Sequence, residues 1–265
     1  MQTVRNRVAD ILGIDLPIVQ APMNYIAGHA LAAAVSAAGG MGVLGPNAGK
    51  VQGEEISMRE RTLREFARIR EVTDKPVGIN VVVPDGENKA ALMYARSTVE
   101  AAAEGGATAA FCVGGLQPTI FELIKEKGMK LIVRPLTPTV KNAREAQAMG
   151  ADIFVATGYD AGGFLPSHHT GTFSIVPTIV DAVTIPVLAA GGINDLRGVR
   201  AAFALGAEGV YVGTRFIATN ECAANDHAKE LICKLSGSNL LYVDETQRSL
   251  PTEFAAEAYV KHRLA

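Results

Sequence analysis

The sequence predicts a (β/α)8 barrel, and the repeating order of its elements is the main reason. Eight short apolar runs, rich in β-branched residues, start 22 to 34 residues apart along the chain. Helix-like segments separate these runs. The runs are almost continuously apolar, which is typical of parallel strands covered by helices. Eight such units in about 250 residues match the barrel, and a doubly wound open sheet, built from the same units, is the alternative.

Predicted strands and helices alternate along the chain. The strands begin at Pro17, Gly42, Pro76, Thr108, Lys130, Asp152, Pro186 and Gly209. Helices are predicted at 29–40, 58–72, 139–151 and 195–209. The first helix is Ala-rich and ends in glycine, and the second places its apolar residues near one face. The charge-rich stretch 50–70 is therefore predicted to be a solvated helix face.

The composition indicates a folded chain with a sizeable core. Hydrophobic residues make up 48% and charged residues 20%, which excludes a disordered protein. The net charge of -2 provides no positive field for nucleic acid or an anionic membrane. Asp10 interrupts any apolar leader, and the apolar stretch 31–45 is too short and too glycine-broken to span a bilayer. We therefore expect a soluble, cytoplasmic protein.

No linker or domain boundary stands out in the sequence. We expect residues 1–265 to form a single barrel domain, with a short C-terminal extension from about residue 222 to residue 265. A closing helix region is predicted within it, at 239–264. Cys112, Cys222 and Cys233 are far apart and form no CxxC pair, so we expect buried, reduced thiols and no metal site.

Glycine-rich loops follow the last two predicted strands. Active sites of parallel barrels lie at the carboxyl ends of the strands, and these two loops often bind a phosphate through backbone N–H groups. Gly191 and Gly192 would let the backbone approach an oxyanion without a Cβ clash. Gly213 and Thr214 would add an amide and a hydroxyl. The two loops together predict phosphate binding, and tight turns without a ligand are the alternative.

A GxGxxG pattern at 40–45 is a competing nucleotide-binding signal. A dinucleotide fingerprint requires this pattern after a strand and at the start of a helix. Here an Ala-rich helix precedes it, and the predicted strand lies inside it. The context is reversed, so the pattern argues against a Rossmann domain.

Two polar residues lie within the apolar strand runs. Arg134 ends the run LIVR, where a cation would face the mouth of the barrel and pair with an anion or with electron-rich ring atoms. An ion pair with a neighbouring acid is the alternative. Asn80 lies inside GINVVV, where a buried amide either satisfies neighbouring backbone groups or binds a ligand.

An ordered set of motifs points to a known family. The set consists of PIVQAPM at 17–23, AAAVSAAGGMGVLG at 32–45, TDKPVGINVVV at 73–83, GYDAGGF at 158–164, IPVLAAGGI at 185–193 and ALGAEGVYVGTRFIATNE at 204–221. It resembles the nitronate monooxygenase family, formerly called 2-nitropropane dioxygenases, over roughly residues 5–225. That family also includes the flavin-dependent enoyl-acyl-carrier-protein reductase II.

The resemblance implies an FMN-binding (β/α)8 barrel. Its implied cofactor residues are Pro22, Met23 and Asn24 along the flavin ring, Asn80 and Arg134 beside it, Gly162 and Gly163 flanking it, and Gly191, Gly192, Gly213 and Thr214 at the phosphate. Family members usually carry a catalytic histidine where this chain has Phe164. His168 and His169 follow shortly after, and we expect one of them, with Arg134, to act in catalysis.

Three functions are consistent with this pattern. The first is FMN-dependent oxidation of a small alkyl nitronate or similar anion by O2, which needs no prior proton abstraction. The second is NAD(P)H-dependent reduction of an enoyl thioester, which needs a positioned acid. The third is an FMN-binding barrel without the usual catalysis. In each case we expect a small-molecule ligand and no nucleic-acid or membrane partner, with homo-oligomer formation left open.

Overall fold

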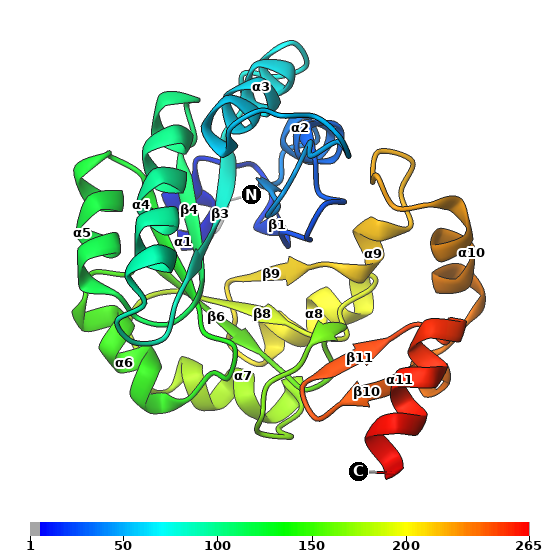
Figure 1. The fold of residues 1–265 in the computed structure, drawn as a ribbon. Helices are drawn as coiled ribbons and strands as arrows, with labels where there is room; N and C mark the ends of the chain where they lie inside the picture. Colours follow the sequence, from blue (N-terminus) through cyan, green and yellow to red (C-terminus); the bar gives the residue numbers. More distant parts are fainter. Residues whose placement is uncertain (1–5, 265) are drawn as a thin grey trace.

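A parallel barrel forms the centre of the molecule (Figure 1). The computed structural model describes residues 6–264, and within them eight parallel strands pair in the order β1-β9-β8-β6-β5-β4-β3-β2. The strands are β1 (Ile18–Gln20), β2 (Gly42–Leu44), β3 (Val77–Val83), β4 (Ala109–Gly114), β5 (Lys130–Arg134), β6 (Ile153–Thr157), β8 (Val187–Ala190) and β9 (Gly209–Val212). All eight predicted strands are present, so the predicted barrel is confirmed.

The seam between β1 and β2 closes the barrel and excludes the open-sheet alternative. Val19 pairs with Met41 in a parallel bridge, and Met41 N donates to Ile18 O over 2.9 Å. The buried side chain of Gln20 adds a third link, because its Oε1 accepts from Val43 N at 2.9 Å. A side chain thus supplies a bond where two short strands provide few backbone bonds of their own.

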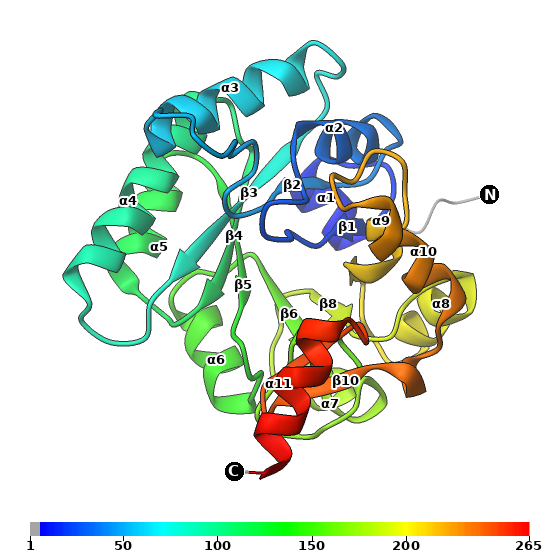
Figure 2. The ribbon, with the colours of Figure 1, turned by 45° about the vertical axis from the view of Figure 1, so that its right-hand side comes forward.

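Helices lie around the strands, and the N-terminal one among them contributes to the apolar cluster inside the barrel (Figures 1 and 2). They are α1 (Arg7–Leu12), α2 (His29–Ala37), α3 (Met58–Arg70), α4 (Lys89–Glu104), α5 (Pro118–Glu126), α6 (Val140–Ala148), α7 (Thr172–Val180), α8 (Leu196–Ala204), α9 (Thr214–Ile217) and α10 (Asp226–Lys234). Capping boxes begin α3 and α6, where Ser57 and Thr139 accept hydrogen bonds from the backbone three residues on. The described helices contain no stretch both long and apolar enough to cross a membrane.

Apolar side chains form two shells. The outer shell lies between strands and helices and includes Phe66, Ile124 and Phe154. The inner shell fills the barrel and includes Phe111, and α1 contributes Leu12 to it. Each fully buried large side chain contributes about 1.5–3 kcal/mol. Because the interior is packed, ligands have access only to the ends of the barrel.

The glycine pattern at 40–45 serves packing. A Cβ on Gly42 would lie 1.9 Å from the backbone oxygen of Ala32, so only glycine lets β2 approach α2 this closely. A Cβ on Gly45 would lie 2.2 Å from Met23 O. The strand β2 lies inside the pattern, and the helix precedes it. The rejection of a dinucleotide fingerprint is therefore confirmed.

The C-terminal region differs from the prediction. The segment predicted as a closing helix region contains a 3-10 turn η1 (Gly237–Asn239), the strands β10 (Leu241–Asp244) and β11 (Gln247–Ser249), and only then the helix α11 (Glu253–Leu264). The hairpin of β10 and β11 pairs with β7 (Gly163–Phe164) in the loop after β6. Figure 2 shows α11 beside β10, with the C-terminus at the edge of the molecule.

Two expectations about burial are wrong. Cys112 and Cys222 are buried, but Cys233 is exposed on α10. The predicted solvated face of α3 contains the buried residues Arg61 and Glu65. The helical spacing of Arg61 and Glu65 places them outside the apolar face of α3, which predicts that they are exposed. The loop after β2 nevertheless covers Glu65, since a Cβ on Gly49 would lie 2.3 Å from Glu65 Oε1.

Candidate functional site

Three loops meet at one side of the barrel mouth. They follow β6, β8 and β9, and their carboxyl ends face the same way because the strands are parallel. A Cβ on Gly162 would lie 2.9 Å from Thr214 Oγ1, and one on Gly192 would lie 3.2 Å from the Cβ of Asp160. The predicted phosphate residues and the predicted glycines of the β6 loop are therefore neighbours in space.

Hydrogen bonds fix the first two of these loops. Thr172 Oγ1 donates to Gly191 O at 3.0 Å, and Gly158 N donates to Ala190 O at 2.9 Å. The Asp160 carboxylate accepts from Thr172 N at 2.6 Å. Thr172 thus ties the β6 and β8 loops to the start of α7. These hydrogen bonds between protein groups hold the β6 and β8 loops together.

The β8 loop requires glycine at two successive positions. Gly191 has a φ of 107° and Gly192 a φ of 69°, in the region that L side chains rarely adopt. Successive residues of this kind can expose backbone amides without a Cβ in front of them. The arrangement suits an oxyanion, as the glycine pattern predicts.

The β1 loop lies beside the β9 loop. A Cβ on Gly213 would lie 3.7 Å from Ala21 Cβ and 4.0 Å from Met23 Sδ. Asn24 Oδ1 accepts from Asn47 Nδ2 at 3.1 Å, which links this loop to the end of β2. Pro22 precedes Met23 in the same loop and is half-buried. The predicted ring-binding segment therefore adjoins the predicted phosphate loops.

Arg134 is a cation without a counter-ion at the end of β5. Among residues 6–264, no acidic side chain forms an ion pair with it, so the alternative of a neighbouring acid fails. Burial lowers the pKa of Arg134 from its ordinary value, and the phenol of Tyr211 nearby opposes that shift. Burial raises the pKa of Tyr211, so this phenol stays neutral at pH 7. A poorly solvated, unpaired guanidinium favours an anionic or electron-rich ligand.

Two buried polar side chains accompany Arg134 inside the mouth. Asn80 donates from Nδ2 to Phe111 O at 3.1 Å, which leaves its amide oxygen to accept from a ligand. The hydroxyl of Thr157 is buried and has no hydrogen-bond partner among the described residues. Sequence reasoning missed Thr157, although the polar residue at the end of the apolar strand β6 was a usable signal. Such orphaned groups favour a ligand that would satisfy them.

Aromatic residues form the rim above the β6 loop. His169 packs on Tyr159 with ring centroids 4.4 Å apart, and Tyr159 stacks on Tyr242 of β10 at 6.0 Å. Arg248 of β11 donates to Asp160 O at 2.7 Å and also to Ala161 O. The C-terminal hairpin is thereby attached to the loop that contains His169. Partial burial raises the pKa of Tyr159, an effect that Tyr242 adds to and Arg248 opposes.

The two candidate histidines differ in their surroundings. Both are exposed, but of the two only His169 packs on Tyr159. Phe164, at the usual histidine position of the family, is 63% exposed and pairs through its backbone with Gln247 of β11. The structure thus brings His169, and not His168, against the residues of the mouth.

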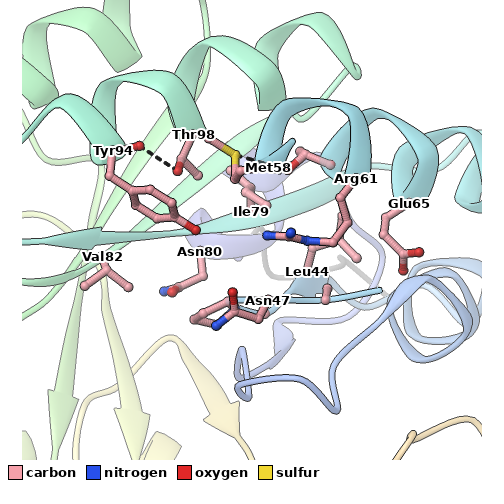
Figure 3. Close-up of a pocket in the computed structure, with 14 residues that line it drawn as sticks. Leu44, Asn47, Met58, Arg61, Glu65, Ile79, Asn80, Val82, Tyr94 and Thr98 are labelled. Carbon is pink, nitrogen blue, oxygen red and sulfur yellow. Dashed lines mark hydrogen bonds between the residues drawn. The ribbon is translucent and has the colours of Figure 1, made fainter. Parts of the chain in front are cut away.

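A cleft lined by polar and apolar residues lies on the opposite side of the mouth, between β3 and the helices α3 and α4 (Figure 3). Its lining includes Leu44, Asn47, Met58, Arg61, Glu65, Ile79, Asn80, Val82, Tyr94 and Thr98. Sequence reasoning found only Asn80 among these. The cleft shares Asn80 with the mouth, so the two are contiguous.

Comparison with known proteins decides the family. The family model of nitronate monooxygenase matches residues 5–263, which is nearly the whole chain. The chain belongs to the nitronate monooxygenase family. The resemblance seen in the sequence motifs is confirmed, and it extends past residue 225 through the C-terminal hairpin.

Relatives of this nitronate monooxygenase family member carry different names. A (3aS,4S,5R,7aS)-5-hydroxy-7a-methyl-1-oxo-octahydro-1H-indene-4-carboxyl-CoA dehydrogenase of Rhodococcus jostii is 34% identical, over 86% of this chain and 60% of its own. A probable nitronate monooxygenase of Staphylococcus saprophyticus is 31% identical, over 85% of this chain and 72% of its own. The chain therefore spans about three fifths of the first relative's length.

Solved structures share the fold. FabK from Thermotoga maritima superposes with a TM-score of 0.82 at 33% identity, covering 96% of this chain and 77% of its own. A nitroalkane oxidase from Streptomyces ansochromogenes gives 0.78 at 26% identity, covering 97% and 82%. The roles of individual site residues in this member of the nitronate monooxygenase family stay predictions.

Proposed function

We propose that this chain is an FMN-dependent oxidoreductase that oxidises a small alkyl nitronate, or a similar anion, with O2. The single observation that carries the proposal is Arg134, a partly buried cation at the carboxyl end of β5 that forms no ion pair with an acidic side chain among the described residues. Family membership and the names of the relatives support the reaction class.

The residues present suit FMN. One glycine-lined cradle, at Gly191, Gly192, Gly213 and Thr214, matches a ligand with one phosphate. The orphaned Thr157 hydroxyl and the free amide oxygen of Asn80 are available to polar atoms of a ring lying over the barrel interior. Met23, with Pro22 and Asn24, would border that ring, and Gly162 and Gly163 would flank it.

Bound FMN would accept the electrons of the substrate and pass them to O2. The chain's own task is then largely electrostatic. Arg134 would hold the negative charge of the substrate, and Tyr211 and Phe111 would exclude water from below. A nitronate already lacks its proton, so the absence of a base at Phe164 is tolerable. We assign His169, rather than His168, a secondary role in proton exchange at the rim.

Reduction of an enoyl thioester with NAD(P)H is the second candidate. The relative named as a carboxyl-CoA dehydrogenase favours it, because the name of that protein contains a thioester-linked substrate. This reaction needs an acid that protonates the α-carbon, and His169 beside Tyr159 is the available group. An FMN-binding barrel without catalysis is the third candidate, supported by Phe164.

Anaerobic reduction of the FMN-loaded chain tests these candidates. The proposal predicts that propyl-2-nitronate bleaches the flavin and that air then brings oxygen uptake. Bleaching by NADH or NADPH, with turnover of an enoyl thioester and no response to nitronates, would replace the proposal by the second candidate. No bleaching by any donor would leave the third.

A further inference from the structure

One side chain of the C-terminal hairpin reaches back to the loop after β6. Arg248 of β11 donates through one guanidinium nitrogen to Asp160 O at 2.7 Å and to Ala161 O. Its backbone pairs with Gly163 of β7, so the main chain and the side chain of one residue hold the same loop (Figure 1). The electron transfer proposed above does not use this cation.

The backbone contacts between the hairpin and the loop are few. β7 has only two residues, and one further bond joins Leu165 N to Thr246 O at 2.6 Å. These contacts lie on the C-terminal part of the loop and do not reach the turn that precedes β7. Among the described residues, no donor other than Arg248 reaches the two carbonyl oxygens of that turn. The position of the turn therefore depends on the Arg248 side chain.

This turn borders the glycine-lined loops at which the proposed function places a phosphate. A Cβ on Gly192 would lie 4.0 Å from Asp160 O, and one on Gly191 would lie 3.2 Å from Ala161 N. The Asp160 carboxylate lies in the same turn and accepts from Thr172 N at 2.6 Å. A carboxylate and carbonyl oxygens are unfavourable neighbours for an anion, because charges of like sign repel. A positive charge attached to the turn would offset this repulsion.

Arg248 supplies a positive charge at this position. Its guanidinium contacts the two carbonyl oxygens and lies 5.9 Å from the centroid of the Tyr242 ring, and no described carboxylate forms an ion pair with it. Tyr242 in turn stacks on Tyr159 of the β6 loop, with centroids 6.0 Å apart. The aromatic ring and the carbonyl groups together orient the planar guanidinium. Its charge stays available to an anion bound at the neighbouring loops.

We propose that Arg248 is a positioning residue of the cofactor site, which holds the β6 loop against the phosphate loops and offsets the negative charge beside them. The role rests on the proposed function, because it assumes that the phosphate group of FMN binds at Gly191 and Gly192. The C-terminal hairpin then takes part in selecting a phosphate-bearing flavin, although its strands lie outside the barrel sheet.

Titration of the full chain with FMN and with riboflavin, followed by flavin fluorescence, tests this role. In Arg248→Met the ratio of FMN affinity to riboflavin affinity should fall about tenfold, because only FMN places an anion beside the turn. Arg248→Lys keeps the charge and should recover more of this ratio than Arg248→Gln, which keeps only an amide donor. Arg263→Met is the matched control and should keep the ratio, because Arg263 is exposed on α11 and donates to Tyr259 of its own helix at 3.0 Å.

The outcomes distinguish this role from a structural one and from failure of the proposed function. A structural role would lower both flavin affinities by the same factor. A wild-type ratio in Arg248→Met, or in Arg248→Gln if only that variant folds, therefore overturns the inference and leaves the proposed function intact.

Calorimetric titration with inorganic phosphate separates the two proposals if the wild type binds neither flavin. That result rejects the proposed function. Phosphate binding that is lost in Arg248→Met would then support the role of Arg248 at an oxyanion site, and phosphate binding that persists would overturn it. A wild type that binds neither flavin nor phosphate overturns both proposals.

Discussion

The two sides of the barrel mouth are built differently. The side at β6, β8 and β9 presents backbone, with Gly162, Gly191, Gly192 and Gly213 bringing the loops together. The side at β3 and β5 presents side chains, including Arg134, which is unpaired among the described residues. Backbone amides at glycines suit a phosphate group, and an unpaired cation suits an anionic group. Under the proposed function, the first side would therefore bind the cofactor phosphate and the second side the anionic substrate.

Of the substitutions that test this difference between the two sides, replacement of Arg134 should cause the largest loss of activity. Arg134→Met removes the cation at the mouth, so kcat/KM for a nitronate should fall about 10²–10³-fold, the range for loss of a charge-stabilising donor. Arg134→Lys should recover part of the rate. The free energy of unfolding without cofactor should not decrease, because the variant buries no unpaired charge. Oxygen-uptake kinetics and urea unfolding measure the two quantities, and an unchanged kcat/KM in Arg134→Met contradicts the assignment.

Substitution on the glycine-lined side should lower the affinity for FMN, with little effect on the turnover of the FMN-loaded protein. Gly191→Ala places a Cβ 2.7 Å from Thr172 Oγ1 at a φ of 107°, so FMN affinity should fall about 100-fold. Gly128→Ala is the control: its φ is 74°, and no described atom lies within 4 Å of the added Cβ. The control should lose some stability and keep FMN affinity. Equal FMN affinity in the two variants, measured by flavin fluorescence, would show that the β8 loop does not bind the phosphate.

The turnover rates of the His169→Ala and His168→Ala variants should differ by about tenfold. His169→Ala removes the ring that packs on Tyr159, and turnover should fall about tenfold, less than the 10²–10⁴ typical of essential acid–base groups. His168→Ala should leave turnover unchanged within twofold. Steady-state kinetics across pH 5–9 measures both. A larger loss in His168→Ala than in His169→Ala would reverse our choice.

The smallest effect concerns the pH dependence of stability on the glycine-lined side. Asp195 caps α8 directly after the β8 loop, and hydrogen bonds from Arg197 lower its pKa to about 2. A lowered pKa in the folded state stabilises the protein above the ordinary value, and this contribution is lost as pH falls from about 4 to about 2. Between about pH 4 and about pH 2, the free energy of unfolding should therefore fall less in Asp195→Asn than in the wild type. Identical urea midpoints for the two proteins at pH 4 and at pH 2.5 would contradict this.

Sequence reasoning found the glycine-lined side and most of the barrel for a local reason. Apolar strands, helices ending in glycine and glycines at strand ends are visible in short windows. The side chains on the other side of the mouth, at β3 and β5 and in the adjoining cleft, were harder to predict. Arg61 has the same helical spacing as its solvated neighbours, yet it is only 9% exposed in the fold. The pairing of β11 with β7 joins segments more than 80 residues apart, which no local pattern reveals.

Comparison of FMN with riboflavin tests the central claim most directly. The two differ only in the phosphate, which the account assigns to the loops at Gly191, Gly192, Gly213 and Thr214. Titration followed by flavin fluorescence should show that FMN binds about 100-fold or more tightly than riboflavin. Added inorganic phosphate should reduce this difference in affinity, because it competes with the phosphate group of FMN. Equal affinities for the two flavins, or no binding of either, would contradict the account.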